Sequence, residues 1–245
     1  MPPMPPVASA VLLFLVVSTL SCSSDATPAQ AGHGARPPGA RYVVVAASDA
    51  VGYGADDPAL DAWPEVLRRT ALPRDARLVN LGIPGATVAV ALEQELAAAL
   101  AEQPDVALVW LSVNDLVAQV PPAVYEQQLA TLVGALRRGG ATRVLVGNTP
   151  PLERLPIFST FDADPDHVDP ALPHPEVVKA AVDAYNAAIG RVAAAEGAEV
   201  VDLHAAGSAA HTAGYGHSLI SEDGFHPSTA GHRAVASAFS MALRS

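Results

Sequence analysis

The chain has 245 residues, of which half are apolar and 16% are charged. This composition excludes an intrinsically disordered protein, because such proteins combine low hydrophobicity with high charge. The 25 acidic residues outnumber the 14 lysines and arginines and give a formal net charge of −11. Since a phosphate backbone would repel such a surface, we expect no nucleic-acid partner.

Residues 1–22 are predicted to be a signal peptide. The apolar stretch Val7–Leu20 is too short to span a bilayer but has the length of a signal-peptide core. Cys22, the only cysteine, ends the segment Thr19–Cys22, which resembles a bacterial lipobox. Cys22 would then carry a lipid anchor, and ordinary signal cleavage beside an incidental cysteine is the alternative. We therefore expect export, as a bacterial cell-envelope lipoprotein or a secreted protein, with membrane contact only through this lipid.

Residues 23–40 are rich in Ser, Pro, Gly and Ala and almost lack large apolar side chains. Such a segment buries too little surface to offset the entropy of ordering, so it is predicted to be a flexible tether. Residues 41–245 are predicted to form one folded domain.

Within that domain, short runs rich in Val and Ile alternate with long stretches rich in Ala and Leu. The runs lack strict polar alternation, which is typical of strands covered on both faces. The expected strands are Tyr42–Ala46, Leu78–Leu81, Val106–Leu111, Arg143–Val146 and Glu199–Leu203. The expected helices are Ala59–Thr70, Val88–Glu102, Pro122–Arg138, Glu176–Glu196 and Ser228 to about Leu243. This alternation predicts an α/β protein with a three-layer flavodoxin-like fold, in which helices cover both faces of a five-stranded parallel sheet.

Four short blocks lie where an active site of such a sheet belongs, at the carboxyl ends of strands and before the last helix. They are Ala46–Gly52, Asn80–Thr87, Ser112–Asp115 and Asp223–Pro227. In this order, the blocks resemble those of the SGNH hydrolases, also called the GDSL family of esterases and lipases. The resemblance covers nearly all of the predicted domain.

The resemblance implies a serine esterase acting on small or medium acyl groups, with Ser48 as nucleophile. His226 would be the general base, and Asp223 would orient it. The expected oxyanion donors are the backbone N–H groups of Ser48 and Gly82 and the side-chain amide of Asn114. The substrate would be a small-molecule, lipid or glycan ester. No cofactor and no metal are expected.

Three other interpretations of these residues are open. The family has Gly-Asp where this chain has Ala46-Ala47, and Gly where it has Ser112, so a catalytically inactive, envelope-anchored binding protein on the same scaffold is the alternative. A phosphate or nucleotide binder of flavodoxin-like shape is disfavoured by the net charge. The segment Gly216–Ile220 nearly matches a nucleophile elbow around Ser218, but no strand precedes it.

The remaining polar candidates are predicted to be structural. Asp49 and Asp115 are expected to cap helices or support loops, and His232 is expected to lie within the last helix. The clustered histidines show no helical i, i+4 pair for a metal; they are His204, His211, His217, His226 and His232.

The segment Leu152–Pro175 is too long for a passive connection at the carboxyl edge. Phe158 and Phe161 give it an apolar cluster, which needs something to pack on. Either these side chains form one wall of an acyl pocket, or they pack against the last helices.

Overall fold

The computed structural model describes residues 39–158 and 172–245. Within these ranges, five strands form one parallel sheet in the order β2-β1-β3-β4-β5. The strands are β1 (Arg41–Ala46), β2 (Arg77–Asn80), β3 (Val106–Trp110), β4 (Arg143–Gly147) and β5 (Glu199–Val201). The predicted fold class is confirmed. The signal peptide with Cys22, nearly all of the tether, and Phe161 lie outside the described residues.

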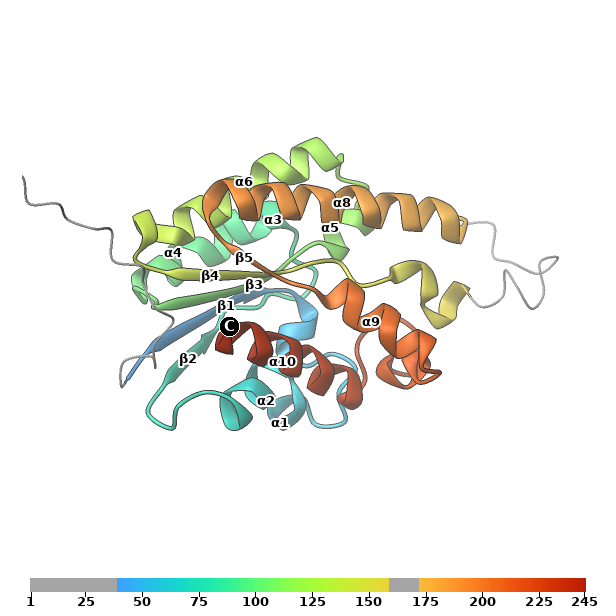
Figure 1. The fold of residues 1–245 in the computed structure, drawn as a ribbon, viewed down its shortest axis with the longest axis horizontal. Helices are drawn as coiled ribbons and strands as arrows, with labels where there is room; N and C mark the ends of the chain where they lie inside the picture. The colour runs from blue at the N-terminus through green and yellow to red at the C-terminus, as the bar shows by residue number, and fades with distance from the viewer. Residues whose placement is uncertain (1–38, 159–171) are drawn as a thin grey trace, which may run out of the picture. The chain divides into compact units, whose positions relative to one another are not determined.

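Helices cover both faces of the sheet (Figure 1). Val43 and Val45 of β1 belong to the core on the side of α6 and α8, whereas Tyr42 and Val44 belong to the core on the side of α2 and α10. Alternate residues of one strand are thus buried on opposite faces, which explains the unbroken apolar runs. The helices are α1 (Pro58–Asp61), α2 (Trp63–Thr70), α3 (Val88–Val90), α4 (Leu96–Ala101), α5 (Val113–Val117), α6 (Pro122–Arg137), α8 (Pro175–Glu196), α9 (Leu203–Thr212) and α10 (Thr229–Arg244).

Two predicted helices are interrupted. The helix expected over Ala59–Thr70 breaks at Ala62, which is extended and precedes α2. Pro64 causes the break, because proline fits the first turn of a helix but not its interior. The helix expected over Val88–Glu102 contains a π-helical turn at Ala91–Glu95. None of the helices in the described ranges is long and apolar enough to cross a membrane.

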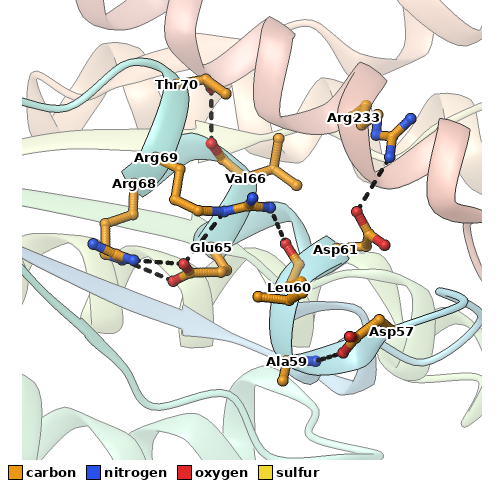
Figure 2. Close-up of polar contacts among 10 residues, drawn as sticks. All are labelled: Asp57, Ala59, Leu60, Asp61, Glu65, Val66, Arg68, Arg69, Thr70 and Arg233. Atoms are coloured by element: carbon orange, nitrogen blue, oxygen red, sulfur yellow. Dashed lines mark hydrogen bonds and ion pairs between the residues drawn. The ribbon is translucent and has the colours of Figure 1, made fainter.

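Helix α10 packs on α2, and this packing holds the last helix in place. Trp63 stacks on Phe239 with ring centroids 4.7 Å apart and an interplanar angle of 11°. Helix α10 also has a polar contact nearby: Arg233 of α10 forms an ion pair with Asp61 of α1 at 3.3 Å, and this pair is drawn in Figure 2. Exposed ion pairs contribute little to stability, so the buried aromatic contact carries most of this interface.

Phe239→Ala should lower the free energy of unfolding by about 3 to 5 kcal/mol, because the variant leaves a cavity beside Trp63. Urea unfolding followed by circular dichroism measures the change. Val177→Ala on α8, where the side chain is 62% exposed, is the control and should shift the free energy by less than about 0.5 kcal/mol. Equal losses in the two variants would contradict the assigned core.

Candidate functional site

Ser48, His226 and Asp223 form a continuous chain of hydrogen bonds at the carboxyl edge of the sheet. His226 Nε2 lies 3.0 Å from Ser48 Oγ, and His226 Nδ1 lies 2.6 Å from Asp223 Oδ2. A carboxylate only accepts hydrogen bonds, so Nδ1 of the neutral ring carries the proton and Nε2 is left to accept from the serine hydroxyl. The arrangement can therefore move a proton from Ser48 to His226.

Asp223 is held in its ionised form by the turn that contains it. Its Oδ1 accepts hydrogen bonds from Ser221 Oγ at 2.7 Å, from the N–H of Phe225 at 2.8 Å and from the N–H of His226 at 2.9 Å. Partial burial works in the opposite direction, but these donors outweigh it and hold the pKa of Asp223 well below its usual range. A negative charge beside Nδ1 favours the imidazolium that forms when His226 takes a proton.

The loop before α10 fixes the position of His226. An antiparallel bridge joins Ile220 to Pro227, and the N–H of Ser221 donates to the carbonyl of His226 at 2.9 Å. Gly54 packs against this loop with φ +83°, and a Cβ there would lie only 2.4 Å from the carbonyl oxygen of Pro227. Only glycine allows this close approach.

Ser48 lies at the turn that follows β1. The strand ends at Ala46, and a 3-10 turn begins at Ser48 and ends before Gly52, whose φ of 89° is left-handed. Ser48 is 9% exposed. Its backbone N–H donates to none of the described residues, so this donor is available at the site.

The other expected oxyanion donors differ in their placement. Asn114, near the start of α5, donates through Nδ2 to the carbonyl of Ala86 at 3.0 Å, which leaves its second amide hydrogen. Gly82 does not line the cavity beside Ser48, and its N–H donates to Asn80 Oδ1 at 3.1 Å. The structure therefore brings Asn114 to the site and leaves the Gly82 amide engaged elsewhere.

Gly85, in the same loop as Gly82, carries a further backbone N–H that the motifs in the sequence did not predict as a donor. It has φ +78°, and the N–H of Ala86 donates to the carbonyl of Ile83 at 2.9 Å. This pattern, with Pro84 before the glycine, is that of a type II turn. Among the described residues, none accepts a hydrogen bond from the N–H of Gly85. In the sequence, the Pro84-Gly85 pair is the feature that indicates this turn.

Two carboxyl groups near Ser48 have raised pKa values, the buried Glu95 and the partly buried Asp49. Glu95, on the π-helical turn, accepts from the N–H of Ala46 at 3.1 Å and is 1% exposed. Burial, together with repulsion from Asp49, raises the pKa of Glu95 to about 8 despite this hydrogen bond. Burial also raises the pKa of Asp49 to about 7, although Trp63 Nε1 donates to it at 2.9 Å. Glu95 is a second residue near the site that none of the sequence motifs predicted.

Asp115 and His232 have structural partners, as expected. Asp115 accepts from the N–H of Val88 at 3.1 and 3.2 Å, at the start of α3, and burial raises its pKa to about 6. His232 accepts from the N–H of Trp63 at 3.3 Å and donates to the carbonyl of Tyr53 at 2.9 Å. Burial lowers the pKa of His232, which keeps this ring neutral.

Ser218 lies in a 3-10 turn over Gly216–Leu219, and its Oγ donates to the carbonyl of Tyr215 at 2.7 Å. It is not the strand-to-helix turn that a nucleophile elbow requires. Within residues 39–158 and 172–245, no group of three or more His, Cys, Asp or Glu side chains is arranged to hold a metal ion.

A cavity of about 430 Å³ opens beside Ser48, Asn114 and His226. Residues 150–155, α9 and α10 supply most of its other walls. Phe158 does not line this cavity. It packs in a buried cluster with Leu152, Leu155 and Val178, so its placement agrees with the packing alternative. Leu152 and Leu155 line the cavity in its stead.

The sequence profile of the GDSL-like Lipase/Acylhydrolase family matches residues 47–234. No curated protein matches the sequence. Among solved structures, a lipase/acylhydrolase from Enterococcus faecalis is 19% identical, with a TM-score of 0.64 over 84% of this chain and 95% of its own.

Two other solved structures are similar. LAE5, described as an α/β hydrolase enzyme from the metagenome of Lake Arreo, is 23% identical, with a TM-score of 0.64 over 85% of this chain and 96% of its own. A variant of an acetyl-xylooligosaccharide esterase from Geobacillus is 22% identical, with a TM-score of 0.62 over 84% and 94%. At these identities the likeness establishes the fold.

Glu95→Gln should make the protein more stable than the wild type at high pH. Because the pKa of Glu95 rises from 4.5 to about 8 on folding, the folded protein binds more protons than the unfolded one between these values, and wild-type stability falls as pH rises through this window. Gln cannot ionise, so its stability relative to the wild type should increase by on the order of 3 kcal/mol between pH 5 and pH 9.

Urea unfolding at both pH values measures this difference. Glu93→Gln is the matched control, because Glu93 lies on the same π-helical turn but is exposed. The stability difference between this control and the wild type should hardly change with pH. A pH-independent difference for Glu95→Gln would contradict the assigned burial of an ionisable carboxyl group.

Proposed function

Because the chain belongs to the GDSL-like lipase/acylhydrolase family, we propose that this ester hydrolase acts through an acyl-enzyme intermediate formed on Ser48. The observation that carries the proposal is the pair of hydrogen bonds that joins Ser48 to His226 and His226 to Asp223. This is the geometry that nucleophilic catalysis by serine requires.

In the first half-reaction, Ser48 Oγ attacks the carbonyl carbon of the ester, and His226 Nε2 takes the hydroxyl proton. The carbonyl electrons move to oxygen and give a tetrahedral oxyanion. When this intermediate collapses, the bond to the alcohol breaks, and His226 returns the proton to the leaving oxygen. In the second half-reaction, His226 takes a proton from water while the water oxygen attacks the acyl carbon and forms a second tetrahedral oxyanion. When this intermediate collapses, the bond to Ser48 Oγ breaks, His226 returns the proton to Oγ, and the acid is released.

The oxyanion needs donors that are in place before charge develops. The N–H of Ser48 and the second amide hydrogen of Asn114 are two such donors, and both residues line the cavity. Neither Gly82 nor Gly85 lines the cavity. For the third donor, we propose Gly85 in place of Gly82, because the amide of Gly85 is unengaged among the described residues whereas that of Gly82 binds Asn80.

The alternative, a catalytically inactive binding protein, rests on Ala46-Ala47 and Ser112. Neither departure touches the hydrogen bonds of Ser48, His226 and Asp223. The N–H of Ala46 has a partner in Glu95. We therefore favour the enzyme. Its substrate is proposed to be a small-molecule, lipid or glycan ester with a small or medium acyl group.

Ser48→Ala should lower turnover of p-nitrophenyl acetate by at least about 10³-fold, since only binding and oxyanion stabilisation remain. Steady-state hydrolysis measures this loss, and a fluorophosphonate probe should label the wild type but not the variant. Ser218→Ala is the control and should stay within about an order of magnitude of the wild type. The reverse pattern would reject the assigned nucleophile, and a wild type that the probe leaves unlabelled would favour the binding protein.

We also propose export with lipid attachment at Cys22, on the sequence evidence alone. A lipid chain contributes about 0.8 kcal/mol per buried methylene to membrane binding. The full chain expressed in a bacterium should therefore sediment with membranes, and Cys22→Ala should release it. Mass spectrometry of the mature N-terminus is the direct measurement. An unmodified Cys22, or a mature terminus elsewhere, would contradict lipidation without affecting the proposed enzyme.

A further inference from the structure

The cavity beside Ser48 continues as a groove between α9 and α10. We propose that this groove binds a linear hydrocarbon chain of the ester substrate, roughly ten carbons long. The inference rests on the proposed function, because it assigns the groove to the substrate of the same site. It goes beyond that function by naming what the site selects.

One wall of the groove is a single face of α10. Its lining residues on this helix include Gly231, Ala234, Val235, Ala238 and Met241, whose spacing of three and four places them along one stripe. Met241 lies ten positions after Gly231, so the stripe is about 15 Å long at 1.5 Å per residue. An extended alkyl chain with C–C bonds of about 1.5 Å advances roughly 1.3 Å per carbon. The wall therefore matches a chain of about ten carbons.

The opposite wall is a face of α9. Leu203, Ala206, Gly207 and Ala210 line the groove at positions i, i+3, i+4 and i+7, which again form one face of a helix. Gly207 lies close to Pro151, whose Cδ would be 2.7 Å from a Cβ added at Gly207. The small side chains on both walls leave the space between the two helices unfilled.

The polar groups of the groove are confined to its ends and rim. Ser48, Asn114 and His226 lie at the end where the chemistry occurs. Asp49, Ser112 and Trp110 also line the cavity, and they belong to the turn and strand ends beside Ser48 and Asn114. The remaining polar lining residues, such as Arg154, His211 and Ser237, are exposed at the rim. A sugar would need hydrogen-bond partners along its length. Between these ends, the side chains that α9 and α10 place along the groove are apolar. Such walls favour a hydrocarbon chain over a sugar.

The chain could belong to the acyl group or to the alcohol, and the two substrate series below separate these sources. For the wild type, kcat/KM should rise by up to roughly fourfold per methylene and level off near ten carbons. p-Nitrophenyl esters from acetate to dodecanoate vary the acyl group. Acetate esters of alcohols from ethanol to dodecanol vary the other side.

Ala206→Trp should block the groove, and Ala205→Trp is its matched control. Both alanines are exposed and adjacent on α9, but only Ala206 lines the groove. Ala206→Trp should lower kcat/KM on the preferred ten-carbon ester by at least about 30-fold and on p-nitrophenyl acetate by less than about threefold. Ala205→Trp should leave both values within about threefold of the wild type.

Binding to inactive protein separates this proposal from the proposed function. In the Ser48→Ala background, calorimetry with p-nitrophenyl decanoate should detect binding that Ala206→Trp abolishes and Ala205→Trp retains. Equal losses on acetate and decanoate, a flat chain-length series in both substrate sets, or binding that Ala206→Trp does not weaken would overturn the groove assignment. A wild type that binds the chain but hydrolyses no ester would instead reject the enzyme.

Discussion

The hydrogen bond between Ser48 and His226 is the constraint on which the domain is organised, because it joins residues 178 positions apart. A misplacement of about 1 Å between reacting groups can cost on the order of 10²-fold in rate, so both ends must be held firmly. At one end, β1 is buried in the sheet between β2 and β3. At the other, His226 precedes α10, and His232 of that helix contacts both Trp63 and Tyr53. The neutral, buried His232 thus positions the catalytic loop without competing for a proton.

The groups around Ser48 follow two different electrostatic rules. Asp223 is partly exposed and receives enough hydrogen bonds to stay charged, as the partner of an imidazolium must. Glu95 is buried and Asp49 is partly buried, and this burial favours their neutral forms. Pairing of β2 with β1 ends at Asn80, and beyond it the N–H of Ala46 needs another acceptor, which Glu95 provides. The buried carboxyl group of Glu95 thus satisfies a backbone N–H of β1 beside the nucleophile. When this group ionises at high pH, the free energy of unfolding decreases.

The sequence predicted the sheet because both-face burial leaves a strong signal, as in the unbroken apolar run of β1. Helix ends near prolines were harder to predict. The helix expected over Ala59–Thr70 contains Pro64, and proline interrupts a helix unless it lies in the first turn. The reacting side chains were expected from the order of the four blocks and their resemblance to the SGNH hydrolases. The oxyanion donors could not be placed in this way, because a backbone N–H such as that of Gly82 or Gly85 is chosen by local hydrogen bonds that residue types do not reveal. Phe158 shows the same limit: its apolar character predicted burial but not which side of the cavity wall it occupies.

Helix α9 was not predicted at all, and the reason also explains the groove. Its sequence is rich in Ala, Gly, Ser and His, so it lacks the large apolar side chains whose periodicity identifies an amphipathic helix. The same small side chains leave room beside α10, where larger ones would have filled the space and closed it. The side chains that leave a cavity open are small, and small side chains produce little hydrophobic periodicity. A cavity is therefore hard to predict from sequence. The stretch least informative for secondary structure is the one that shapes the space next to Ser48.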